Sequence, residues 1–131
     1  MWRQALHDLG HAERSLAGGD FDWAMLAAQQ AAEKGLKSVL LVAGLRADAT
    51  HNLAGLFDAL VAAGIAERGA RAALNEPLAF LTLAFGFARY PQADLAEAPA
   101  DLVVREQAES ALRGAAAIIA ECRRMAPEID A

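Results

Sequence analysis

The stretch FDWAMLAAQQAAEKGLKSVLLVA, residues 21–43, decides the fold class of this chain. Its apolar residues recur every three or four positions, a period that places them along one side of an α-helix. These residues are Phe21, Ala24, Ala28, Ala31, Ala32, Leu36, Val39, Leu40 and Ala43. Alanine favours helix, and its small side chain lets a neighbouring helix approach closely. The stretch therefore predicts a long central helix, capped by Asp20 and ended by Gly44.

The same helical period extends to both sides of this segment. It predicts helices over residues 2–17, 51–63, 76–88 and 101–125, with Thr50 as a candidate cap of the second of these. Residues 65–75 are expected to form a short helical turn and a loop, and residues 89–100, which hold two prolines, an irregular connection. No stretch alternates as a strand would. We therefore expect an all-α, antiparallel, up-and-down bundle of four to five helices, forming a single domain over residues 1–131.

Composition narrows the classes of function. The net charge of −5 argues against a general binder of polyanions, although it leaves room for a small basic site. Cys122 is the only cysteine, so no internal disulfide is possible, and we expect it to be a core residue in a reducing cytosol. The apolar run over residues 78–88 is too short to span a bilayer, and no signal region precedes it. We expect a cytoplasmic protein without a membrane partner.

Three segments together resemble the HEPN family, the higher eukaryotes and prokaryotes nucleotide-binding domain. They are residues 21–37, the triplet His51-Asn52-Leu53, and the end of the fourth long helix at residues 88–91. The resemblance covers residues 2–125 and implies a helical bundle that forms a homodimer. It also implies one of two roles. Some members bind nucleotides or a minimal nucleotidyltransferase, as in toxin–antitoxin pairs. Others are metal-independent ribonuclease toxins, with an arginine followed four to six residues later by a histidine near a dimer cleft.

Arg46 and His51 are separated by four residues and so match the ribonuclease spacing. A histidine can move a proton at a ribose 2′-hydroxyl, and an arginine can stabilise the charge that develops on the phosphate. In ribonuclease members, however, the motif usually lies nearer the last helices, whereas this pair precedes the third predicted long helix. The alternative is that His51 makes a structural hydrogen bond at a helix start and Arg46 is a solvated loop charge.

Two further groups are candidate ligand-binding residues. Arg89 and Tyr90, at a helix end, could grip a phosphate and stack on a base, or they could simply pack the mouth of the bundle. Glu33, Lys34 and Lys37 could border a nucleotide site or a partner surface. We prefer the simpler interpretation that these three residues form a solvated face.

We expect no metal site, because His7 and His11 lack a third ligand. We also expect no cofactor beyond a bound nucleotide. The favoured hypothesis is a nucleotide-binding module or nucleotidyltransferase partner, more consistent with a binding protein than with an enzyme. The alternatives are a metal-independent ribonuclease acting on RNA through Arg46 and His51, and a purely structural dimerisation module.

Overall fold

The computed structural model describes residues 1–89 and 102–130, and helices dominate its architecture. The elements are α1 (Trp2–Ala17), α2 (Phe21–Val42), α3 (Leu53–Ala62), α4 (Arg68–Ala73), α5 (Asn75–Arg89), α7 (Arg105–Met125) and the 3₁₀-helix η1 (Pro127–Asp130). The described ranges contain no β-strand, which confirms the predicted all-α class. No helix within these ranges has the length and apolar character needed to cross a membrane.

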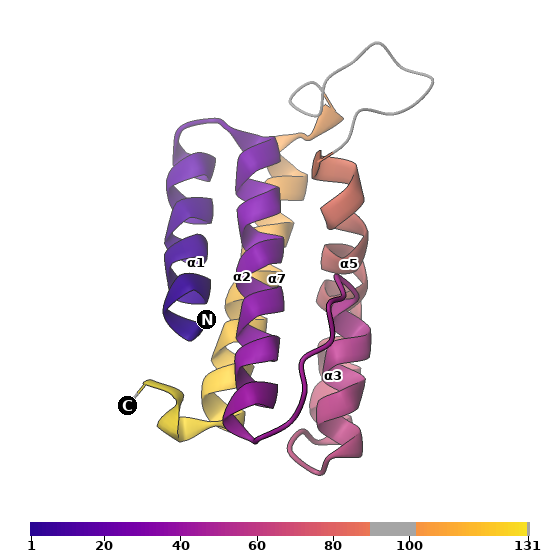
Figure 1. Cartoon of the computed structure of the whole chain (residues 1–131). Helices are drawn as coiled ribbons and strands as arrows, with labels where there is room; N and C mark the ends of the chain where they lie inside the picture. The colour runs from indigo at the N-terminus through magenta and orange to yellow at the C-terminus, as the bar shows by residue number, and fades with distance from the viewer. Residues whose placement is uncertain (90–101, 131) are drawn as a thin grey trace.

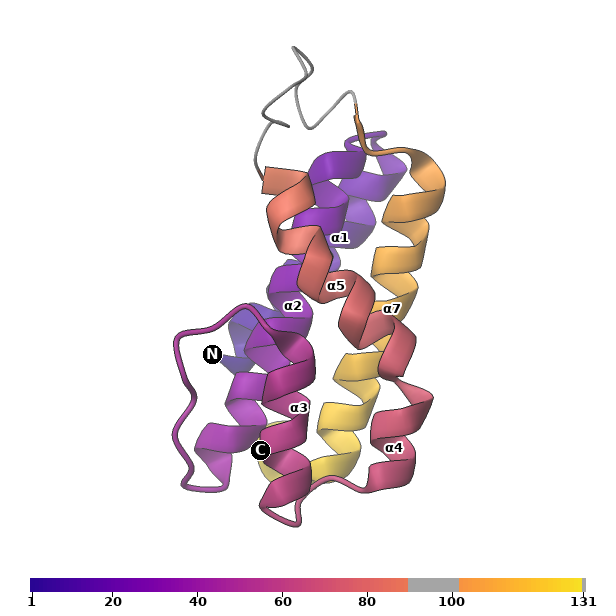
Figure 2. The same cartoon turned by 90° about the vertical axis from the view of Figure 1, so that its right-hand side faces the viewer.

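The long helices lie side by side, with α1 and α5 running in one direction and α2 and α7 in the other (Figure 1). α1 and α2 form a hairpin, and α7 and α5 complete the bundle beside α2. Figure 2 shows α3 and α4 at the end of the bundle away from the α1–α2 turn, with α5 continuing from α4 towards that turn. α3, α4 and α5 together thus fill the fourth position of the bundle.

α2 is the central helix, because it packs against α1, α3, α5 and α7. Four alanines of its predicted apolar side, Ala24, Ala28, Ala31 and Ala32, are fully buried. Ala43, predicted to belong to the same side, is instead exposed at the C-cap. Gly35 allows a close approach to α7, since a β-carbon at this position would lie only 2.7 Å from Cδ1 of Ile119. Small side chains therefore let the bundle close tightly around α2.

The helix ends correct several predictions. α3 begins at Leu53 rather than residue 51, and its N-cap is Asn52, whose side chain accepts a hydrogen bond of 3.1 Å from the Gly55 N–H. The Thr50 hydroxyl instead accepts from the Asn52 N–H, so the predicted Thr50 cap is wrong. Asp20 occupies the N-cap position of α2, but its side chain makes no capping hydrogen bond.

α7 begins later than expected, at Arg105, and the predicted start at residue 101 lies outside the described residues. The side chain of Gln107 accepts a hydrogen bond of 3.0 Å from the Val104 N–H and so satisfies a donor at this helix start. The short helical turn expected within residues 65–75 is present as α4.

Asp130 fastens η1 to two other elements. Its carboxylate accepts a hydrogen bond of 2.7 Å from Nε1 of Trp2 in α1 and one of 3.0 Å from Nε of Arg123 in α7. These donors lower the pKa of Asp130 below its ordinary value. The arginine also lies over the Trp2 ring, 5.5 Å from its centroid. This set of contacts holds the first and last described elements together.

Cys122 in α7 is fully buried, as predicted. Burial, and secondarily the negative charge of Glu121, raises the pKa of its thiol to about 12. The thiol therefore remains protonated near neutral pH, as expected of a core residue.

Candidate functional site

A network of polar side chains, buried at its centre and open to solvent at His51, lies between α2 and the segment that leads into α3. We call it the Glu33 cluster, and its members are Gln29, Glu33, Lys37 and His51. Glu33 is only 5% exposed and Gln29 is fully buried, so the predicted solvated face is wrong at its centre. Oε1 of Glu33 lies 2.7 Å from Nδ1 of His51 and accepts a hydrogen bond of 3.0 Å from Nε2 of Gln29, while Oε2 accepts one of 3.1 Å from Nζ of Lys37.

The spacing of the cluster explains its assembly. Residues 29, 33 and 37 recur every four positions and so share one face of α2. Beyond α2 the chain brings His51 onto this face from outside the helix. The imidazole stacks on Phe85 of α5, with ring centroids 3.6 Å apart and planes inclined by 15°. The ring of Phe85 and the carboxylate of Glu33 thus fix the orientation of the His51 imidazole.

The electrostatics of the cluster favour an ionised Glu33. Burial alone raises the pKa of its carboxyl, but hydrogen bonds from His51, Gln29 and Lys37 together outweigh that effect and lower it below the ordinary value of 4.5. An ionised carboxylate accepts the proton on Nδ1 of His51. Neutral His51 then has its lone pair on Nε2, and its side chain is 51% exposed. Nε2 of His51 can therefore accept a hydrogen bond from a ligand or take up a proton.

The two other predicted cations lie apart from this network. Lys34 forms a salt bridge of 2.6 Å with Asp8 of α1. The side chain of Arg46 is 92% exposed, and its Nε lies 3.7 Å from Oδ1 of Asp48. The structure therefore supports the interpretation of Arg46 as a solvated loop charge and does not bring it into the Glu33 cluster.

The predicted ligand-binding pair Arg89 and Tyr90 falls at the limit of the described residues. Arg89 is the last residue of α5, and Tyr90 lies outside the described residues. Among the described residues, no group of three or more His, Cys, Asp or Glu side chains is arranged to hold a metal ion.

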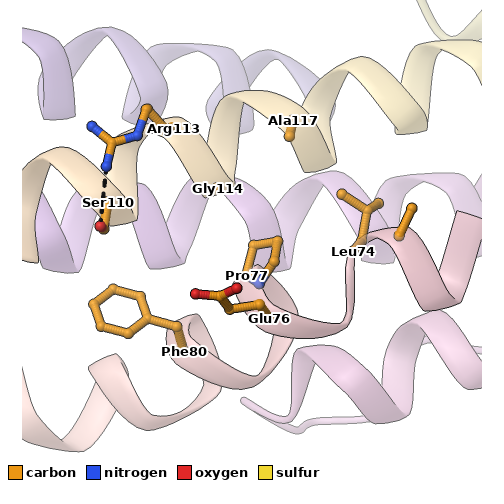
Figure 3. Close-up of a pocket in the computed structure, with 9 residues that line it drawn as sticks. Leu74, Glu76, Pro77, Phe80, Ser110, Arg113, Gly114 and Ala117 are labelled. Atoms are coloured by element: carbon orange, nitrogen blue, oxygen red, sulfur yellow. Dashed lines mark hydrogen bonds between the residues drawn. The ribbon is translucent and has the colours of Figure 1, made fainter.

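A second polar feature is a groove of about 500 Å³ between the start of α5 and the middle of α7. Figure 3 shows Ser110 and Arg113 on the α7 side of this groove, and Glu76 and Phe80 on the α5 side. Leu74, Ala117 and Gly114 also line it. Its volume is about twice that of the cavity of about 250 Å³ near Arg46 and Asn52.

Close packing of the two helices builds the floor of this groove. A β-carbon at Gly114 would lie 2.9 Å from Cβ of Pro77, so only glycine lets the start of α5 approach α7 this closely. The groove is not predicted from the sequence. The spacings Glu76–Phe80 and Ser110–Arg113 place each pair on one helix face, but periodicity alone cannot show that the two faces meet.

Comparison with known proteins identifies the family. The HEPN domain model matches residues 1–125. The crystal structure of TT1696 from Thermus thermophilus is 35% identical, with a TM-score of 0.83, over 95% of this chain and 94% of that one. The fold also matches ST0689, an archaeal HEPN homologue (22% identity, TM-score 0.72, 94% of this chain and 92% of that one).

A HEPN domain protein from Thermotoga maritima, tm0613, has the same fold, with 24% identity and a TM-score of 0.72 over 97% of each chain. No curated protein matches the chain. The family model covers nearly all of the sequence, and the helices that it spans form the bundle described above. The chain belongs to the HEPN domain family.

Proposed function

We propose that this HEPN domain is a nucleotide-binding module, not itself a nuclease, that works with a protein partner. The observation that carries the proposal is the groove between α5 and α7. It combines a guanidinium from Arg113, an aromatic ring from Phe80 and a carboxylate from Glu76 in one opening of about 500 Å³. Small-molecule sites commonly have this size and this mixture of apolar walls and a few polar groups.

The state of the candidate catalytic pair supports binding over catalysis. RNA cleavage by this pair needs the arginine beside the phosphate on which the histidine acts. Arg46 instead extends into solvent and contacts Asp48, whereas His51 is held by Glu33 and Phe85. The two side chains are thus engaged by different partners.

Titration calorimetry of the purified chain with AMP, GMP, ATP and GTP tests the proposal. Saturable binding of at least one nucleotide, retained in the variant Arg46→Ala, supports a binding module that does not depend on the ribonuclease pair. Absence of heat and of any shift in melting temperature with all four nucleotides contradicts it.

A second candidate function, a metal-independent ribonuclease, is favoured by the contact between Glu33 and His51. An ionised carboxylate on Nδ1 leaves Nε2 able to take a proton from a 2′-hydroxyl, as a general base does. If this function is correct, expression arrests growth and purified protein cleaves RNA, and His51→Ala abolishes both effects. If wild-type protein leaves a mixed RNA substrate intact, this candidate is eliminated.

The partner in our proposal is a second copy of this chain or a minimal nucleotidyltransferase, and α5 is the candidate contact face. Leu83 is 75% exposed beside an apolar hollow that Met25, Phe80 and Ala84 also line. Light scattering of wild type and Leu83→Glu tests self-association, which we expect the charge to weaken. Co-expression with a minimal nucleotidyltransferase tests the other partner. A dimer that binds neither nucleotide nor nucleotidyltransferase would instead fit a purely structural module.

A further inference from the structure

We propose that the groove between α5 and α7 selects nucleotides with a single phosphate, a specificity that rests on the proposed nucleotide binding. Nine residues, all within the described part of the chain, line the groove. Among them Arg113 is the one cation and Glu76 the one anion. A matching ligand has one anionic group for Arg113 and hydroxyl or amino groups for Glu76. It also has a flat apolar part for the ring of Phe80.

Arg113 is the group that would hold the phosphate. Its NH2 nitrogen donates a hydrogen bond of 3.2 Å to Oγ of Ser110, and the other guanidinium donors have no acceptor among the described residues. A guanidinium presents paired donors that match two oxygens of one phosphate. The hydrogen bond to Ser110 orients the guanidinium at the groove (Figure 3).

Phe80 is the group that would contact the base. Its ring is half-buried, lies on the groove and comes from the helix face opposite Arg113. Every base offers a flat π-face to such a ring, so stacking gives affinity without choosing the base. Leu74 and the Cβ of Pro77 extend the apolar wall around it.

Glu76 is the group that would exclude further phosphates. Its side chain is exposed and makes no hydrogen bond or ion pair within the described residues. It can accept hydrogen bonds from ribose hydroxyls, a role that carboxylates take in nucleotide sites. The same charge repels the additional phosphates of a triphosphate, for which the groove offers no second cation.

The geometry predicts an order of affinities at low ionic strength. AMP binds about fivefold more tightly than ATP, because one unit charge at a few ångströms in a solvated site is worth about that factor. AMP also binds about tenfold more tightly than adenosine, which lacks the group that Arg113 holds. Added salt reduces both differences in affinity, because it screens the charges.

Titration calorimetry with AMP, ATP and adenosine on wild type and variants tests this inference. Ala117→Leu places bulk in the groove from an exposed position and is expected to weaken AMP binding about tenfold or more. Ala116→Leu, next to it on the exposed surface of α7 and outside the groove lining, is the matched control. Arg113→Ala should weaken AMP about tenfold and leave adenosine within about twofold. Glu76→Gln should raise ATP affinity about fivefold and change AMP much less.

The outcomes separate this inference from the function on which it rests. If AMP binds but Ala117→Leu weakens it no more than Ala116→Leu, the groove is not the site, although nucleotide binding stands. If ATP binds as tightly as AMP in wild type, the selectivity is wrong. If none of the three ligands binds, the inference is overturned, and if GMP and GTP also fail to bind, the proposed function is overturned with it.

Discussion

Glu33 in the middle of α2 and His51 in the segment before α3 are joined by a contact of 2.7 Å between Oε1 and Nδ1. Eighteen positions separate the two residues in the sequence. The carboxylate also neutralises Lys37, so one buried side chain satisfies three neighbours. The contact makes Glu33 the residue on which the geometry of this region depends.

Replacing this carboxylate should therefore destabilise the protein. We expect Glu33→Gln to lower the free energy of unfolding by about 2 kcal/mol, because it leaves the largely buried Lys37 without its counter-charge. Urea denaturation measures the loss. The control is Glu109→Gln, whose carboxylate lies 4.0 Å from Arg105 on the surface and should cost less than about 0.5 kcal/mol. Equal losses in the two variants would mean that the buried network contributes nothing special.

The lowered pKa of Glu33 predicts how this stabilisation depends on pH. Because the pKa of the folded protein lies below the ordinary value of 4.5, the unfolded chain takes up a proton first as the solution is acidified. The contribution is complete above that ordinary pKa and is lost as pH falls through the folded pKa. Between about pH 5.5 and 3, wild type should lose stability faster than Glu33→Gln.

Urea midpoints of both proteins across this pH range provide the measurement. Asp130, whose pKa is also lowered, is present in both proteins, so its effect cancels in the difference. A difference in stability that stays constant with pH would rule out titration of Glu33 as its origin.

Two glycine substitutions should change stability in opposite directions. Gly35→Ala forces a β-carbon to within 2.7 Å of Cδ1 of the buried Ile119 and should cost up to about 2 kcal/mol, because overpacking of about 1–3 kcal/mol outweighs a gain of up to about 1 kcal/mol in helix propensity. Gly86→Ala, in α5, meets no described atom within 4 Å and should gain up to about 1 kcal/mol through helix propensity. Thermal unfolding followed by circular dichroism distinguishes the two. A stabilising Gly35→Ala would show that α2 and α7 are less closely packed than described.

The start of α3 offers a comparison of two candidate caps. Asn52→Ala removes the acceptor for the Gly55 N–H and should cost about 1 kcal/mol. Thr50→Ala removes only the acceptor for the Asn52 N–H, outside the helix, and should cost less than half as much, about 0.5 kcal/mol or below. Chemical denaturation measures both, and a larger loss from Thr50→Ala would reassign the cap.

The sequence predicts the helices well because their signal is local. The alanine stripe of α2 and the buried Cys122 follow from periodicity within one segment. The predicted exposure of Glu33 is wrong, because the same periodicity shows that this residue lies on a polar face but not that His51 covers that face. Arg46 matches a catalytic spacing, yet the path of its loop turns it towards Asp48. Position in space, rather than residue type, decides these cases.

The groove escaped prediction for a related reason. Each of its walls is a pair of residues on one helix, and either pair alone is typical of a solvated surface. They form a site because Gly114 admits Pro77 at close range, and that contact joins segments distant in the sequence. A glycine amid the alanines of residues 108–117 was the one local sign of close helix packing.

The central position of α2 also has a consequence for the order of folding. α1 and α2 follow each other through the short turn around Gly19, so their pairing closes only a small loop. α7 is far from α2 in the sequence, so the contact between them closes a long loop and costs more chain entropy. We therefore expect the α1–α2 hairpin to form first and α7 to dock late. A nucleotide bound between α5 and α7 would then contact the helix that docks last and would slow the detachment of α7 from the bundle.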